Sequence, residues 1–214
     1  MLKQVRSILG VAATAAIAAC AVSQSAQAAT IIDEWASVKV PPPPALHPVT
    51  VDPKTTALLM IDFNKQTCNM QRRPRCVASI PHVEKLLKEA RAAGAMVAYS
   101  VGGGGVAAEI AKEVAPTKDE PVVSSGVDKF RNTDLEKVLK DKGIKTVIVV
   151  GAAAHGGVLY TASTAAMLGF KVIIPVDGVT AHYRYAEQYA AWHFANAPII
   201  SKSVTLTSID QVKF

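Results

Sequence analysis

Thr146-Val-Ile-Val-Val-Gly-Ala-Ala-Ala-His-Gly-Gly-Val-Leu-Tyr-Thr-Ala162 is the stretch that decides the fold of this chain. Its first half is an apolar run rich in β-branched residues, which indicates a buried strand of a parallel sheet. Small residues then form a turn, and we expect a helix to begin near Gly157. Such junctions often carry reactive groups, because helix N-terminal amides stabilise developing negative charge.

Strand and helix patterns alternate on both sides of this stretch. We predict strands over 56–63, 95–100, 146–151, 171–176 and 202–207, and helices over 82–93, 106–114, 133–142, 157–168 and 184–195. This alternation implies a mainly parallel sheet covered by helices on both faces. The predicted fold class is therefore α/β, a three-layer α/β/α arrangement with a Rossmann-like sheet, in which the loops after the strands share one rim.

Candidate site residues are expected at that rim, where ligands usually bind in α/β sheets. Asp62 ends the apolar run Leu58-Leu-Met-Ile61, and a buried carboxylate there needs a partner or a pocket. Asp177 precedes Gly178 and is assigned to a turn instead.

Three segments, Ala57–Asn64, Val123–Leu135 and the stretch around Gly157, resemble the isochorismatase-like cysteine hydrolases, a superfamily of nicotinamidases, N-carbamoyl amidases and isochorismatases. The resemblance extends from about Thr55 to Asp177. In that family an Asp takes the proton of a nucleophilic Cys, and a Lys holds the pair in its charged form. The resemblance implies that Asp62 is the Asp, that Ser124 occupies the Lys position and that Gly157 occupies the Cys position. It also implies a cis peptide at Ala152–Ala153.

Glycine at position 157 excludes thiol catalysis there, because it has no side chain to acylate. We therefore predict a degenerate site that binds a small, anionic molecule. The alternative is a hydrolase of amides or esters in which Asp62 and His155 activate water. Lys129 could swing into the space vacated at the lysine position, but its place just before Phe130 favours a surface ion pair. Neither a metal ion nor another cofactor is expected. The predicted ligand-binding residues are Asn64, Ser124, Ala153, Gly156, Gly157, Arg72 and Arg73.

The first 28 residues have the pattern of a secretory signal peptide, with Lys3 and Arg6 before an Ala-rich apolar run that ends Ser25-Ala-Gln-Ala28. The competing interpretation takes Ile17-Ala-Ala-Cys20 as a lipobox and Cys20 as a lipidated first residue. Either way we expect an exported protein, periplasmic or secreted, without a transmembrane segment in the mature chain. Cleavage would leave a Pro-rich extended arm (29–54) and one domain (55–214).

Export makes a disulfide between Cys68 and Cys76 the expected state, and two free buried thiols the alternative. The enclosed segment contains Arg72, Arg73 and Arg75. If it lies over the rim it attracts an anionic ligand; otherwise it is an ordinary solvated loop.

The charge and the aromatic content limit which kinds of partner are expected. The net charge of +6 becomes +4 without Lys3 and Arg6, and the remaining basic residues are mixed with acids, so no nucleic acid partner is indicated. Tyr185, Tyr189 and Trp192 recur at helical spacing, which is typical of packing, and we expect a homo-oligomer.

Overall fold

The computed structural model describes residues 28–214 as two units, 28–40 and 41–214. The predictions of a signal peptide and of a lipidated Cys20 fall on residues 1–27, outside the described part of the chain. The first unit contains α1 (Ile31–Glu34) and a 3-10 turn (Trp35–Ser37). Asp33 accepts hydrogen bonds from the backbone amide and the hydroxyl of Thr30, both at 2.8 Å, which caps this short helix.

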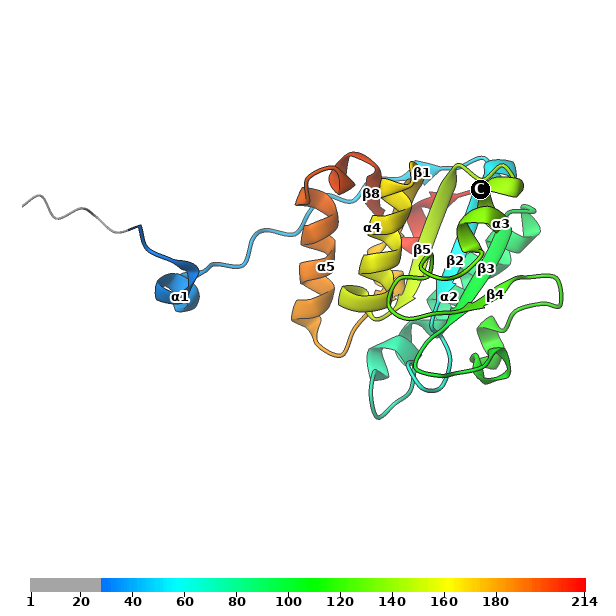
Figure 1. Ribbon diagram of the computed structural model, residues 1–214, viewed down its shortest axis with the longest axis horizontal. Coiled ribbons are helices and arrows are strands. Elements are labelled where there is room, and N and C mark those ends of the chain that lie inside the picture. The colour runs from blue at the N-terminus through cyan, green and yellow to red at the C-terminus, as the bar shows by residue number, and fades with distance from the viewer. Residues whose placement is uncertain (1–27) are drawn as a thin grey trace, which may run out of the picture. The chain divides into compact units, whose positions relative to one another are not determined.

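The second unit is built on a parallel sheet (Figure 1). The strand order is β4-β3-β2-β5-β6-β8, and β7 pairs with β5. All of these pairings are parallel, and β2 and β5 form the centre with Thr56 opposite Thr146. The strands are β2 (Thr56–Ile61), β3 (Met96–Val101), β4 (Val122–Ser124), β5 (Thr146–Ala152), β6 (Lys171–Pro175), β7 (Val179–Thr180) and β8 (Val204–Thr207).

Helices cover both faces of the sheet. Leu58 and Met60 of β2 pack in the core with α2 (Pro74–Ala92), and Leu59 and Ile61 pack in the opposite core. That opposite core contains residues of α3 (Leu135–Asp141), α4 (Leu159–Met167) and α5 (Arg184–Asn196). Successive side chains of a strand point to opposite faces, so two cores require a continuous apolar run. The predicted three-layer α/β/α fold is confirmed.

Two predicted helices differ from the structure. α2 begins at Pro74 rather than near residue 82, because proline fits the first turn of a helix and Pro81 is tolerated inside it. The helix predicted over 106–114 is wrong: two 3-10 turns, Ala107–Glu109 and Lys112–Val114, take its place. The amide of Ala111 donates to the carbonyl of Phe63 at 3.1 Å, so contacts with the loop after β2 replace a helical ladder.

A second, two-stranded sheet was not predicted. β1 (Val49–Thr50) pairs in parallel with β9 (Val212–Lys213), and β1 belongs to the segment expected as an extended arm. Neither strand shows an alternating pattern long enough to be recognised in the sequence.

An ion pair outside the main sheet links α2 to the loop before β4. The Arg91 guanidinium donates to both carboxylate oxygens of Glu120, at 2.9 and 2.7 Å, and to the Tyr99 hydroxyl at 3.0 Å. Burial raises the pKa of Glu120, but hydrogen bonds from Arg91 and from the Thr117 amide outweigh burial, so the net pKa is lowered. Burial raises the pKa of Tyr99.

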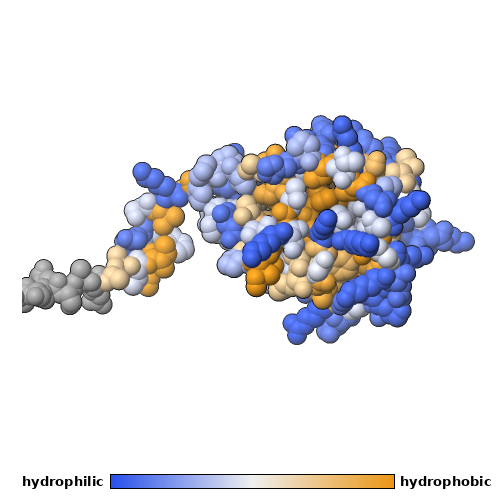
Figure 2. Space-filling view, turned by 90° about the horizontal axis from the view of Figure 1, so that it is seen from above, coloured by the Kyte–Doolittle hydropathy of each residue, from blue (hydrophilic) through white to orange (hydrophobic). Residues whose placement is uncertain are grey.

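The parallel strands place their carboxyl ends at one edge, which lies at the bottom of Figure 1. Figure 2 is seen from above and shows the opposite side, where apolar residues lie among hydrophilic ones.

Across residues 28–214, no helix is both long and apolar enough to cross a membrane. Tyr185, Tyr189 and Trp192 are exposed on α5, and the homo-oligomer stays a prediction.

Candidate functional site

Asp62 follows β2 and is buried, with 6% of its surface exposed. Its φ of 55° lies in the left-handed region, which a non-glycine residue adopts at a cost and which marks a candidate functional position. One carboxylate oxygen, Oδ1, accepts a hydrogen bond from Ser100 Oγ at 2.6 Å. The other, Oδ2, lies 2.8 Å from Lys129 Nζ. Each oxygen of the buried carboxylate therefore has one hydrogen-bond partner.

Lys129 is the cation of this pair, and only 1% of its surface is exposed. Its ammonium also donates to the Gly126 carbonyl at 2.7 Å, and its backbone amide donates to Thr161 Oγ1 at 3.2 Å. Of the two interpretations of Lys129, the favoured surface ion pair is therefore wrong, and the structure places its ammonium at the lysine position instead. The assignment of the lysine position to Ser124, which is exposed at the end of β4, is also wrong.

The reason for this correction lies in the loop between β4 and α3. Ser125 Oγ donates to the Asp128 carbonyl at 2.7 Å, so the chain folds back on itself within a few residues. Such a loop brings a residue five positions after Ser124 to the sheet edge. Counting residues along the chain does not identify which side chain arrives there.

Gly157 is buried and faces the Asp62–Lys129 pair. A Cβ atom built on Gly157 would lie 3.3 Å from Asp62 Oδ2, and 3.1 Å from both Ile61 Cγ2 and the Ala152 carbonyl oxygen. The position therefore lies where a side chain would contact the carboxylate. Because residue 157 is glycine, the site contains the Asp62 carboxylate and the Lys129 ammonium but no nucleophilic side chain at this position.

The turn before α4 contains the other small residues predicted to bind a ligand. The Ala152–Ala153 peptide is cis, as predicted. Residues Ala154–Val158 form a π-helical turn, and the Gly156 amide donates to the Ala153 carbonyl at 2.9 Å. Ala153 and Gly156 are half-buried beside Gly157, and their role in ligand binding stays a prediction.

Asn64 holds the glycine loop after β3 against the site. Its Nδ2 donates to the Gly102 carbonyl at 3.0 Å and to Gln66 Oε1 at 2.7 Å. A Cβ atom at Gly102 would lie 2.5 Å from Asp62 Oδ2, so only glycine allows this approach. The amide of Asn64 is thus occupied by a structural contact next to the carboxylate.

His155 is exposed, and the structure does not bring it to Asp62, whose two oxygens bind Ser100 and Lys129. Asp177 lies in the 3-10 turn Val176–Gly178, as assigned, and its carboxylate accepts a hydrogen bond from the Ile209 amide at 2.9 Å. No three His, Cys, Asp or Glu side chains within residues 28–214 are grouped closely enough to hold a metal ion.

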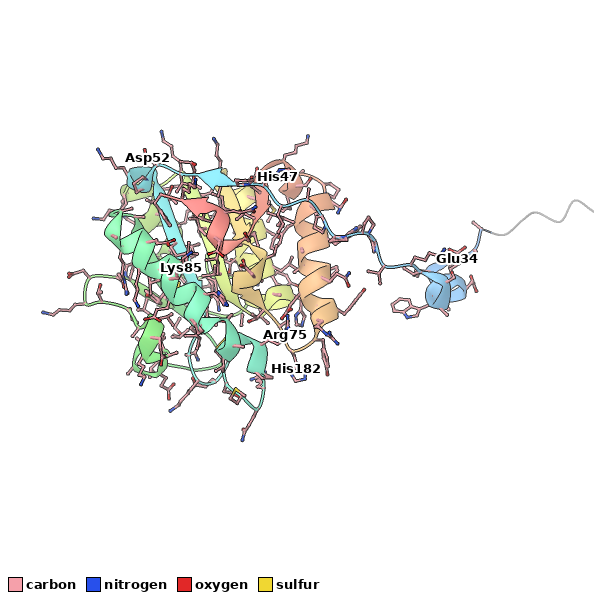
Figure 3. All side chains as sticks on the ribbon, turned by 180° about the vertical axis from the view of Figure 1, so that it is seen from behind. Glu34, His47, Asp52, Arg75, Lys85 and His182 are labelled. Atoms are coloured by element: carbon pink, nitrogen blue, oxygen red, sulfur yellow. A yellow bond between two sulfur atoms is a disulfide. The ribbon has the colours of Figure 1, made fainter. Side chains whose placement is uncertain are left out.

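The predicted Cys68–Cys76 disulfide is confirmed, with the two Cα atoms 5.4 Å apart. Arg75, which directly precedes Cys76, donates to both carboxylate oxygens of Glu187 on α5, at 2.8 and 2.5 Å. His182 Nδ1 contacts the Arg72 carbonyl nearby. Figure 3 shows Arg75 and His182 at the same end of the molecule. These contacts hold the disulfide loop against the start of α5. No pattern in the sequence around Glu187 indicated its ion pair with Arg75.

The three arginines of the disulfide loop therefore differ. Arg75 is paired, and Arg72 is exposed with one weak contact, from Nη1 to the Gln66 carbonyl at 3.3 Å. Arg73 is half-buried, and its Nη1 donates to the Thr67 carbonyl at 2.8 Å.

A parallel sheet between two layers of helices, with a buried Asp62–Lys129 pair, is the arrangement that the resemblance to the isochorismatase-like hydrolases implies. The Isochorismatase domain family matches residues 56–204, and the chain belongs to this family. The membership predicted from the sequence is confirmed.

Several relatives agree with this assignment. The secreted isochorismatase effector Isc1 of Verticillium dahliae (strain VdLs.17) is 30% identical over 144 residues, which are 62% of this chain and 76% of that protein. An isochorismatase-like hydrolase from Alkaliphilus metalliredigens superposes with a TM-score of 0.66 at 24% identity, covering 73% of this chain and 96% of its own. For N-carbamoylsarcosine amidase from Thermoplasma acidophilum the TM-score is 0.64 at 20% identity, covering 73% of this chain and 97% of the amidase. The two structures share the fold with this chain.

Proposed function

We propose that this protein binds a small molecule non-covalently at the site formed by Asp62, Lys129 and position 157. The observation that carries the proposal is the geometry at Gly157, where the first atom of any side chain would lie 3.3 Å from Asp62 Oδ2. The charged pair is in place, and the atom that would attack a substrate is missing.

The buried pair itself supports a binding role. Two charges removed from water gain little net stability from each other, so such a pair is weak evidence of a structural purpose. A desolvated carboxylate and ammonium can instead form strong, oriented hydrogen bonds with a polar ligand. A ligand amide or carbonyl group next to Gly157 would find both a donor and an acceptor.

Ligand-dependent thermal stabilisation tests the proposal. A library of small amides, esters and carboxylic acids is screened against the wild-type protein by differential scanning fluorimetry, since a ligand that binds only the folded state raises the unfolding temperature. Gly157→Ala adds a methyl group beside Asp62 and should abolish the stabilisation. Ala92→Val, which adds methyl groups at an exposed position of α2, is the control.

The same library tests the alternative, a hydrolase that activates water through Asp62. The structure gives His155 no contact with that carboxylate, so we do not assign it a role. Turnover that disappears in Asp62→Asn would contradict the binding-only proposal. If no compound stabilises the wild-type protein, or if Gly157→Ala leaves stabilisation intact, the proposed site is wrong.

We also propose that the protein is exported. The basic N-terminus before an apolar run, the Cys68–Cys76 disulfide and a relative described as secreted support this proposal. Mass spectrometry of the N-terminal peptide of the mature protein tests it. A peptide that begins at Ala29 supports cleavage, a lipidated Cys20 supports the anchored form, and an intact Met1 contradicts both.

A further inference from the structure

Exposed lysines occur at the amino ends of four neighbouring strands of the main sheet. They are Lys54 before β2, Lys145 before β5, Lys171 at the start of β6 and Lys202 before β8. These strands are adjacent in the order β2-β5-β6-β8. Because neighbouring strands lie about 4.8 Å apart, the lysines form a row of about 15 Å along the amino edge of the sheet, which we name the lysine row.

Backbone hydrogen bonds fix the spacing of the lysine row. The Lys145 amide donates to the Thr55 carbonyl at 2.8 Å, and the Lys171 amide donates to the Lys145 carbonyl at 2.9 Å. The Val172 amide donates to the Ser203 carbonyl at 2.8 Å, beside the last lysine of the row. The sheet itself therefore holds these positive charges side by side.

The protein does not neutralise the lysine row. Within residues 28–214, none of its ammonium groups forms an ion pair, whereas the lysines of α2 and α3 are all paired with carboxylates. Asp52 lies beside the row, and its carboxylate accepts a hydrogen bond from the Lys54 amide at 3.0 Å and caps the turn before β2. Like charges at neighbouring positions of a sheet repel each other, so an anionic partner is favoured at this edge.

The chain enters the domain at the edge that carries the lysine row. Figure 3 shows His47 and Asp52 at one end of the domain and Arg75 and His182 at the other. Residues 47–55 therefore lead into β2 from the amino edge of the sheet. Further toward the start of the sequence is the Ala-rich apolar run, whose pattern is typical of a segment directed to a membrane. The row thus belongs to the edge at which a membrane-directed segment is connected.

A bilayer with anionic headgroups fits the lysine row better than a small anion does. The row is extended and exposed, so it does not enclose a single ligand, and a surface with many negative charges can contact all of its lysines at once. Figure 2 shows this side of the molecule, where apolar residues lie among hydrophilic ones. Both apolar contact and electrostatic attraction strengthen binding to an anionic membrane surface.

We propose that the lysine row binds the surface of an anionic phospholipid membrane. In this orientation the amino edge of the sheet faces the headgroups. The Asp62–Lys129 site lies at the carboxyl edge, so it faces away from the membrane and stays open to solution. Membrane binding through the row does not depend on the ligand of that site.

Vesicle co-sedimentation tests the proposal. The full chain, with its disulfide intact, is mixed at pH 7 with vesicles of phosphatidylcholine alone or of phosphatidylcholine with about 30% phosphatidylglycerol, a content that gives a negative surface potential. Neutral vesicles measure the contribution of the apolar N-terminal stretch, and the ratio of the two affinities measures the contribution of charge. The ratio should be roughly 100 at about 50 mM NaCl and should fall toward one at about 500 mM, because salt screens the attraction.

Three double variants locate the charge effect. Lys145→Gln/Lys171→Gln, in the centre of the row, should lower the ratio roughly 10- to 30-fold, since each lysine near an anionic surface contributes about fivefold. Lys145→Arg/Lys171→Arg keeps the charge and should keep the ratio. Lys65→Gln/Lys112→Gln is the matched control, because it removes the same charge from exposed loops beside the carboxyl edge. An unchanged unfolding midpoint shows that each variant is folded.

The possible results separate a membrane from other partners. Equal binding of the wild-type protein to both kinds of vesicle, or an equal loss in the row variant and the control variant, overturns the proposal. So does a wild-type protein that ignores anionic vesicles but binds dextran sulfate through the row, because the partner is then a soluble polyanion. A loss confined to Lys145→Gln/Lys171→Gln and removed by high salt supports the proposal.

Discussion

Replacing Lys129 with methionine should strongly destabilise the protein, because it leaves the Asp62 charge buried without its counter-ion. Asp62 is 6% exposed and Lys129 is 1% exposed, so water cannot take the place of the missing partner. Removing one member of a buried pair costs about 3–5 kcal/mol. Asp62 keeps the Ser100 hydroxyl at 2.6 Å, and we therefore expect a loss at the lower end of that range.

A double-mutant cycle measures the pair itself. Asp62→Asn alone leaves the ammonium with the Gly126 carbonyl and should also be destabilising. The double variant Asp62→Asn/Lys129→Met removes both charges, and it should be more stable than the sum of the single effects by about 2–3 kcal/mol. Urea unfolding at pH 7, followed by circular dichroism, gives the four free energies if the m-values agree.

Lys137→Met provides the matched control. Lys137 is also paired with an aspartate, Asp141, but on the exposed surface of α3, so the free energy of unfolding should hardly change. If Lys129→Met is as mild as Lys137→Met, or if the two site substitutions are additive, the ion pair is not the buried, mutually dependent unit described above.

Three further predictions concern the nucleophile position, the disulfide and the ion pair of α2. Gly157→Cys should yield a thiol that reacts faster with iodoacetamide at pH 6 than the exposed thiol of His155→Cys, because Lys129 favours the thiolate; equal rates would contradict this. Cys68→Ala/Cys76→Ala should lower the free energy of unfolding by about 2–3 kcal/mol through loop entropy, and an unchanged urea midpoint would argue against it. Folding lowers the pKa of Glu120, so the ionised carboxylate stabilises the folded protein. This contribution to the free energy of unfolding is fully present above the pKa of the unfolded state, and it is lost as the pH falls through the lower pKa of the folded state. Glu120→Gln should therefore reduce stability at pH 7 but not at about pH 3, and a deficit equal at both values would refute the assignment.

The arrangement of the sheet could be predicted from local sequence alone. Continuous apolar runs such as Leu58-Leu-Met-Ile61 and Val147-Ile-Val-Val150 are buried on both faces, and this requirement is visible without any knowledge of the partners. The failure of the helix expected over 106–114 has a different origin. Its backbone groups bind the loop after β2, and no local pattern reports that contact.

The sequence by itself determined that position 157 has no nucleophile, because glycine carries no side chain in any conformation. It also predicted the disulfide between Cys68 and Cys76, because an exported protein is expected in an oxidising compartment. Only the tertiary structure decided that Lys129, rather than Ser124, accompanies Asp62, and that Arg75 rather than Arg73 pairs with Glu187. These choices depend on how irregular loops fold back toward the sheet edge. A loop's path is set by contacts with distant residues, such as Glu187 for Arg75 and Thr161 for the Lys129 backbone, and residue spacing does not encode those contacts.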